Sequence, residues 1–78
     1  MPIAPLDEQA AELLESLVSN HALADGNRRI GWLATVVFYG LDGVNLEAPD
    51  DDAYRLVVGV ASGDVGYQEA AVALARWQ

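Results

Sequence analysis

The sequence predicts an all-α fold, a small four-helix bundle, on three observations. Apolar residues recur at spacings of three and four in four separate segments, which is the pattern of helices with one buried face. Glycine and aspartate, which favour turns and helix ends, lie between those segments. No segment shows the strict alternation of apolar and polar residues that indicates a β-strand.

The length and composition indicate one domain. The chain has 78 residues, and 53% of them are hydrophobic, which argues against disorder. We therefore expect a single helical domain over residues 1–78, with residues 1–6 as an N-terminal arm that does not resemble a signal peptide. The sequence has no cysteine, so it forms no disulfide or thiolate metal site, and this fits a cytoplasmic protein.

The first helix is expected from about Asp7 to Ser19, with Asp7 as its N-cap. Its acidic residues lie largely opposite an apolar face, so one side of this helix should be buried and the other solvated. The expected inner face consists of Ala10, Leu13, Leu14, Leu17 and Val18.

The second helix is expected from near Asn27 to about Leu41. It is apolar on every side, which predicts a central helix that is buried all round. Its apolar run is shorter than the roughly 20 residues of a membrane span, so we expect no membrane contact. One face is expected to consist of Ile30, Leu33, Ala34, Val37, Phe38 and Leu41, and the other side of Trp32, Val36 and Tyr39.

The third helix should open at Pro49 or Asp50 and end at Ser62, with Gly63 as its C-terminal cap. The run 50–52 is a possible metal site, but three aspartates at a helix start are explained by the helix dipole alone. Asp64 should cap a fourth helix over roughly residues 65–77. The expected inner faces consist of Ala53, Leu56, Val57 and Val60, and of Ala70, Ala71, Leu74 and Trp77.

The charge of the chain excludes one class of partner and indicates one kind of site. The net charge of −8 repels a phosphate backbone, so nucleic-acid binding is not expected. Only four residues are basic, and two of them, Arg28 and Arg29, are adjacent. Positive charge gathered at one point of an acidic protein predicts a local anion site.

Groups suited to acid–base and metal chemistry precede those arginines. His21 is the only histidine and can act as a general base near neutral pH. Asp25 offers carboxylate oxygens, which Mg²⁺ prefers together with substrate phosphates. A lone histidine is more often a surface or capping residue, and residues 25–27 also form an ordinary turn sequence.

Groups suited to binding phosphate follow directly. Gly26 lets backbone N–H groups approach an anion, and Asn27 opens the predicted helix, whose start attracts phosphate. Arg28 and Arg29 add forked donors for phosphate oxygens, although paired arginines are usually only solvated. A base, a metal ligand and an anion site close together are the set that phosphoryl transfer from ATP with Mg²⁺ requires. Trp32 and Tyr39, by contrast, are more simply explained by core packing.

The combination of His21, Asp25, Gly26, Asn27 and Arg29 resembles the active-site motif of the Fic/Doc family, His-x-Phe-x-Asp/Glu-Gly/Ala-Asn-Gly/Lys-Arg. The motif follows one amphipathic helix and opens a second, as in that family. The stretches 52–57 and 61–63 also look like the C-terminal part of bacterial Doc-like proteins. The resemblance therefore covers roughly residues 6–77.

Several positions depart from the family pattern. Leu23 replaces the usual phenylalanine, and Arg28 stands where Doc-like proteins carry lysine. Trp32 occupies the position of a second arginine in the AMP-transferring members, and a tryptophan there resembles the Doc branch. Doc-like proteins are longer, so we expect a short form that lacks their N-terminal part, including the flap that aligns the target. No inhibitory segment is recognised, which implies a separate antitoxin.

The resemblance implies a toxin of a toxin–antitoxin pair that transfers phosphate from ATP to a Ser/Thr hydroxyl of elongation factor Tu. In that role His21 would deprotonate the hydroxyl, and Asp25 would orient it or hold Mg²⁺. The triphosphate would be bound by Gly26, Asn27, Arg28 and Arg29. Two alternatives stay open: a non-catalytic truncated or redesigned bundle that binds an antitoxin or itself, and an AMP transferase. The apolar surface also predicts a homodimer.

Overall fold

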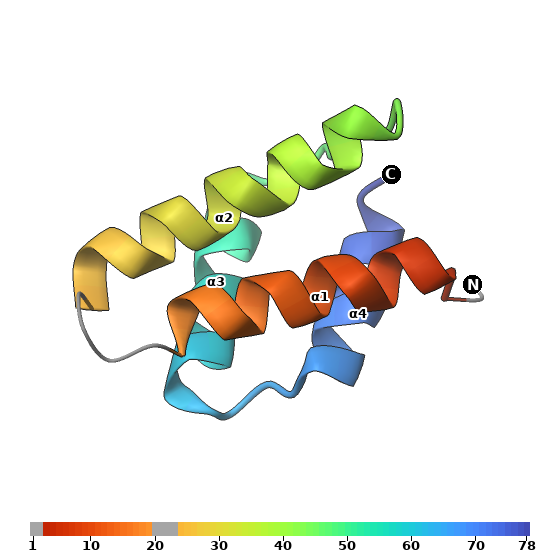
Figure 1. Ribbon diagram of the computed structural model, residues 1–78. Helices are drawn as coiled ribbons and strands as arrows, with labels where there is room; N and C mark the ends of the chain where they lie inside the picture. The colour runs from red at the N-terminus through yellow and green to blue at the C-terminus, as the bar shows by residue number, and fades with distance from the viewer. Residues whose placement is uncertain (1–2, 20–23) are drawn as a thin grey trace.

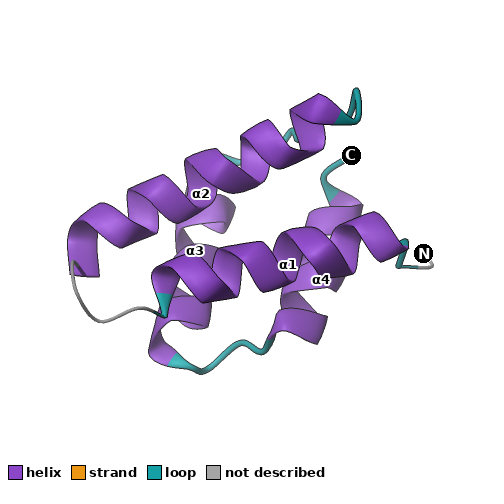
Figure 2. Ribbon diagram, viewed as in Figure 1, coloured by secondary structure: helices purple, strands orange, loops and turns teal. Residues whose placement is uncertain are grey.

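The computed structural model describes residues 3–19 and 24–78, with side chains for all of these except 24–27 (Figures 1 and 2). Over this part of the chain there are four helices and no strand, which confirms the all-α prediction. None of these helices is long and apolar enough to cross a membrane. The helices are α1 (Pro5–Val18), α2 (Ala24–Leu41), α3 (Asp50–Ser62) and α4 (Tyr67–Arg76).

Helix α1 lies at the centre of the bundle. It contacts all three other helices, while α2 packs against α1 and α3 (Figure 1). Figure 1 shows α1 and α2 running side by side in opposite directions, with α3 and α4 behind them. The sequence predicted α2 as the central element, and this was wrong because α1 occupies that place.

The buried face of α2 also differs from the prediction. The helix was predicted to be buried all round, but of its described side chains and glycines only Gly31, Thr35 and Tyr39 are buried. Four of the six residues of the first predicted face are exposed, and the other two, Ala34 and Phe38, are half-buried. The reason is close packing on α1. A Cβ atom added at Gly31 would lie 2.5 Å from Cγ1 of Val18. Gly31 lets the two helices approach this closely, so the face that carries it packs on α1 and the opposite face is left exposed. The exposed stripe consists of Ile30, Leu33, Val37 and Leu41.

A buried polar contact ties the start of α1 to α2 and to the C-terminus. The helix begins at Pro5, so Asp7 lies in its first turn and is not the N-cap, which is Ala4. Asp7 is 2% exposed; its Oδ2 accepts the N–H of Ala4 at 3.0 Å and its Oδ1 accepts the hydroxyl of Tyr39 at 2.6 Å. The side-chain amide of Gln78 also donates to Oδ1. Burial, together with the Asp7 carboxylate, raises the pKa of Tyr39 well above its usual range.

The remaining elements follow the sequence closely. Helix α3 begins at Asp50 with all three aspartates in its first turn, and Gly63 caps it with a left-handed φ of 87°. Helix α4 has Gly66 as its N-cap, so the prediction that Asp64 caps it was wrong. The Asp64 carboxylate instead accepts the hydroxyl of Ser62 at 3.2 Å. The buried residues that agree with the predicted inner faces are Ala10, Leu14, Val18, Ala53, Leu56, Val57, Val60, Ala70, Ala71 and Leu74.

Candidate functional site

The start of α2 carries most of the candidate site residues. The helix begins at Ala24, three residues before the predicted start at Asn27. Asp25 to Arg29 therefore lie on the first turns of a helix and not in a loop. Glycine and asparagine cost little in a first turn, where backbone N–H groups have no intrahelical partner, and Asp25 is favoured there by the helix dipole. Backbone N–H groups at the start of a helix can bind an anion.

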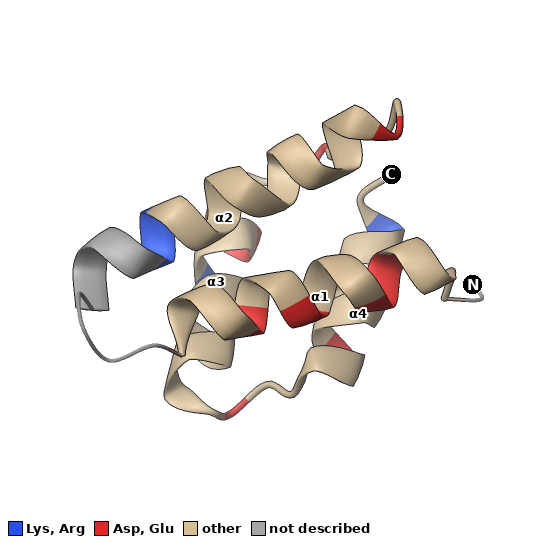
Figure 3. Ribbon diagram, viewed as in Figure 1, with Lys and Arg blue, Asp and Glu red and all other residues tan. Residues whose placement is uncertain are grey.

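The structure describes only part of the predicted constellation. His21 lies outside the described residues, and the described part of α2 gives backbone but not side chains for residues 24–27. The predicted roles of His21, Asp25, Gly26 and Asn27 therefore remain predictions. Arg28 and Arg29 are described: the first is half-buried and the second is exposed. Figure 3 shows them as a basic band at the start of α2, with acidic residues spread over α1 and α3.

A groove of about 500 Å³ lies between the first half of α2 and the first half of α3. Both arginines line it from α2, so the one described part of the predicted anion site borders a space large enough for a ligand. The full lining consists of Arg28, Arg29, Trp32, Asp50, Ala53, Tyr54 and Val57. The sequence indicated the α2 wall of this groove but not the α3 wall.

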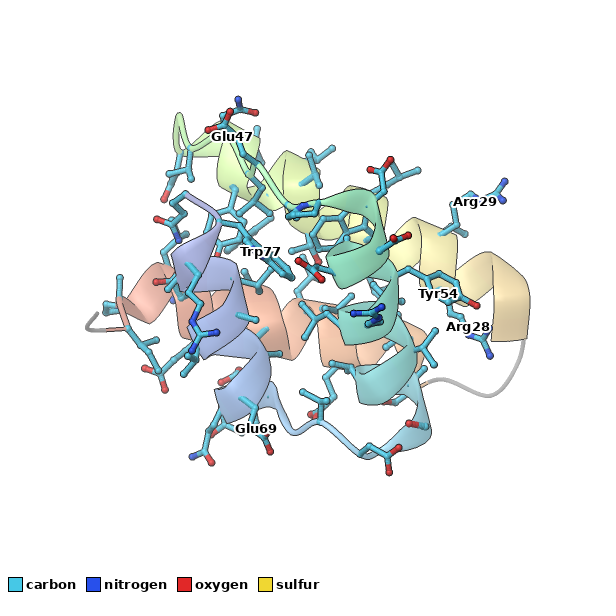
Figure 4. All side chains as sticks on the ribbon, turned by 180° about the vertical axis from the view of Figure 1, so that it is seen from behind. Arg28, Arg29, Glu47, Tyr54, Glu69 and Trp77 are labelled. Carbon is cyan, nitrogen blue, oxygen red and sulfur yellow. The ribbon has the colours of Figure 1, made fainter. Side chains whose placement is uncertain are left out.

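Tyr54 lines the groove from α3. It is 65% exposed, and in Figure 4 it extends from α3 towards Arg28, whereas Arg29 points away to the outside. A ring held this way can stack on a flat ligand or on a guanidinium group. The only signal in the sequence was an aromatic residue placed off the apolar face of its helix.

Trp32 packs against the core and also lines the groove. Its ring packs edge-on against Trp77, with ring centres 6.2 Å apart and an interplanar angle of 80°. It is half-buried against the core, which confirms the packing prediction in part, but it also lines the groove. A tryptophan in this position gives the groove an apolar floor one helical turn after Arg28.

Charge in the groove is not uniform. Asp50 lines the groove from the start of α3, while Asp52 lies 3.9 Å from Arg55 in an exposed ion pair. An exposed pair of this kind contributes little to stability. Within the described side chains no group of three acidic, histidine or cysteine residues could hold a metal ion. The run 50–52 lies in the first turn of α3, where the helix dipole favours negative charge.

Comparison with known proteins adds two findings. The model of the Fic/DOC family matches residues 3–39, the segment that includes α1 and most of α2. A curated protein named Toxin Doc, from Mycolicibacterium smegmatis, is 43% identical over 70 residues, which is 87% of this chain and 54% of that protein. The chain thus spans about half the length of this relative. No solved structure matches the chain.

Proposed function

The chain belongs to the Fic/DOC family, and from that premise we propose that it is a Doc-like toxin that transfers the γ-phosphate of ATP to a Ser/Thr hydroxyl of a translation factor. In this reaction the hydroxyl oxygen bonds to the γ-phosphorus, the bond from that phosphorus to the bridging oxygen breaks, and ADP leaves. The target proposed from the family resemblance is elongation factor Tu, which places the reaction in the cytoplasm.

The observation that carries the proposal is the groove beside the start of α2. Its volume of about 500 Å³ suits a nucleotide, since small-molecule sites span roughly 300–1,000 Å³. Arg28 and Arg29 line the groove near the start of α2, where the helix dipole favours an anion, and this supports binding of the phosphates there. Trp32 and Tyr54 supply aromatic surface for the base. The residues present therefore fit ATP.

The chemistry rests on residues that precede the arginines. We propose that His21 takes the proton of the target hydroxyl, because an imidazole can act as a general base near neutral pH. Asp25 orients that hydroxyl or holds Mg²⁺, which would neutralise phosphate charge when bound. Gly26 and Asn27 lie in the first turn of α2, and their proposed role is to bind the phosphates through this helix start. Catalysis of this kind depends on positioning and charge, which a helix start beside a groove can supply.

Trp32 favours transfer of phosphate over transfer of AMP. An AMP transferase of this family carries a second arginine at that position, and the groove here has an apolar ring there. Without that cation, less positive charge is available to hold the phosphates in the arrangement that exposes the α-phosphorus. The AMP-transfer alternative is therefore the weaker of the two enzymatic proposals.

The partners follow from the same proposal. A toxin of this kind is held inactive by an antitoxin, which we propose as the protein's regulatory partner. The relative's name, Toxin Doc, supports that pairing. The non-catalytic alternative, a bundle that binds an antitoxin or itself, draws support from the exposed apolar stripe of α2, which offers a binding surface without any chemistry.

Labelled ATP separates these proposals. The chain is incubated with elongation factor Tu, Mg²⁺ and ATP carrying label on either the γ- or the α-phosphorus. We expect γ-label on the factor, no α-label, and loss of transfer in His21→Ala and Arg29→Ala. Arg76→Ala is the matched control, because Arg76 is an exposed arginine on α4 away from the groove. Transfer of α-label would establish an AMP transferase instead, and absence of any transfer would favour the non-catalytic bundle.

A further inference from the structure

Trp77 contacts the floor of the groove without lining the groove itself. Its ring lies edge-on to the ring of Trp32, with ring centres 6.2 Å apart and an interplanar angle of 80°. Rings in this arrangement attract each other, because the positive edge of one meets the negative face of the other. Among the described residues, the lining of the groove includes Trp32 but not Trp77. The Trp32 ring therefore contacts both the groove and a second ring that lies outside it.

Several contacts fix the backbone that carries the Trp77 ring. The N–H of Trp77 donates to the carbonyl of Leu74 at 3.2 Å, and its carbonyl accepts the N–H of Glu47 at 2.7 Å. The next residue, Gln78, donates its side-chain amide to the buried Asp7. The Trp77 side chain is half-buried and points from the end of α4 into the bundle, where it packs against the core (Figure 4). A ring held by this many contacts can act as a rigid support for its neighbour.

Trp32 needs a support of this kind because it borders an unfilled space. Its side chain is half-buried, and the groove beside it has a volume of about 500 Å³. A ring next to such a space can change rotamer and turn into it, unless packing on another side holds the ring in place. A ring that is already held in position binds a ligand more tightly, because its freedom is not lost on binding. The edge-on contact with Trp77 supplies this restraint.

We propose that Trp77 is a positioning residue of the nucleotide site: through its edge-on contact it holds the Trp32 ring where that ring meets the base of ATP. The inference rests on the proposed function, since it takes the base to lie against Trp32. The phosphates are taken to bind near Arg28 and Arg29, about one helical turn before Trp32 on α2. Loss of the Trp77 ring should therefore weaken binding of the whole nucleotide but not of a triphosphate without a base.

Two substitutions separate the ring contact from apolar packing in general. Trp77→Leu keeps an apolar side chain but has no ring, whereas Trp77→Phe keeps a ring edge for Trp32. The chain has two tryptophans, so in both variants all tryptophan fluorescence comes from Trp32. We expect the anisotropy of this fluorescence to be lower in Trp77→Leu than in Trp77→Phe, because the Trp32 ring turns more freely without its support.

Calorimetric titration with ATP and with inorganic tripolyphosphate, each with Mg²⁺, tests the inference on binding. Trp77→Leu should raise the Kd for ATP by about two- to tenfold, the range that an edge-on ring pair supports, and leave the Kd for tripolyphosphate unchanged. Trp77→Phe should bind ATP like the parent. Tyr67→Leu is the matched control and should also bind ATP like the parent, because Tyr67 is a half-buried aromatic residue at the other end of α4 that does not line the groove.

The parent chain supplies a test that needs no substitution. The indole N–H resonance of Trp77 should shift on titration with ATP, although Trp77 does not line the groove, and should not shift with tripolyphosphate. A Trp77 resonance that stays in place while that of Trp32 shifts would overturn the inference. So would a Trp77→Leu chain that binds ATP like the parent, or one that loses affinity for ATP and tripolyphosphate equally; in these cases the nucleotide site itself stands. A parent chain that binds no ATP would instead overturn the proposed function together with the inference.

Discussion

Replacing Gly31 by alanine tests the close packing of α2 on α1. The added Cβ atom would meet Cγ1 of Val18 at 2.5 Å and Cδ1 of Leu14 at 3.3 Å. The first distance is far below a normal carbon–carbon contact, and Val18 cannot turn away easily, because it is branched at Cβ and buried. Either α2 must move away from α1 or Val18 must leave its preferred rotamer.

The expected change in the free energy of unfolding follows from two opposing effects. Overpacking a core position costs about 1–3 kcal/mol of the free energy of unfolding. Alanine in place of glycine inside a helix raises the free energy of unfolding by up to about 1 kcal/mol. Gly31→Ala should therefore lose up to about 2 kcal/mol. Gly40→Ala, in the same helix with nothing within 4 Å of its added Cβ, should gain up to about 1 kcal/mol.

Thermal unfolding followed by circular dichroism measures the difference between the two variants. It should reach about 1–3 kcal/mol, and each 1 kcal/mol corresponds to about 4–8 °C in a domain of this size. All variants are compared at one chain concentration, because self-association would make the melting temperature depend on concentration. The reasoning fails if Gly31→Ala and Gly40→Ala are stabilised equally. Val18→Ala supplies a further check, since removing its Cγ1 atom should make Gly31→Ala less costly in the double variant.

Two further substitutions probe the buried contact and the groove. Tyr39→Phe removes a buried hydrogen bond to a carboxylate and should lower the free energy of unfolding by about 1.5–3 kcal/mol. Because the pKa of Tyr39 is raised in the folded state, the parent should lose stability as the pH rises above about 10, and urea unfolding of Tyr39→Phe should show a smaller loss. Trp32→Arg should remain helical by circular dichroism, because its side chain can reach the groove, yet should transfer no α-label from ATP. Collapse of its helical signal would mean that the packing on Trp77 outweighs access to the groove.

Periodicity was enough to predict the four helices but not which face of α2 is buried. Ile30 and Leu33 are more hydrophobic than Gly31 and Thr35, so hydrophobicity alone favours the wrong face. The deciding factor is shape: Gly31 admits Val18, and the Thr35 hydroxyl donates to the carbonyl of Gly31 at 2.8 Å and so needs no outside partner. Complementarity between two helices is a property of the pair and cannot be deduced from either one alone.

Some residues of the candidate site could likewise be predicted from the sequence, and others could not. Arg28 and Arg29 could be predicted from the sequence, because two adjacent cations in an acidic chain stand out. Tyr54 could not, since the groove exists only where α3 meets α2. Asp7 and Tyr39 are 32 residues apart, and nothing local signals that the carboxylate of the first accepts the hydroxyl of the second. Contacts between distant residues are set by the tertiary arrangement of the helices.

Titration of the chain with ATP and Mg²⁺, followed through the backbone amide shifts, tests the central claim that the α2–α3 groove holds the nucleotide. We predict saturable shifts at the start of α2, at Arg28 and Arg29, together with shifts at Tyr54 on the facing wall. Arg29→Ala should weaken binding, and Arg76→Ala should leave it unchanged. Shifts confined to α4 and to the second half of α2, or no saturable shift at millimolar nucleotide, would contradict the assignment of this groove as the site of phosphate transfer.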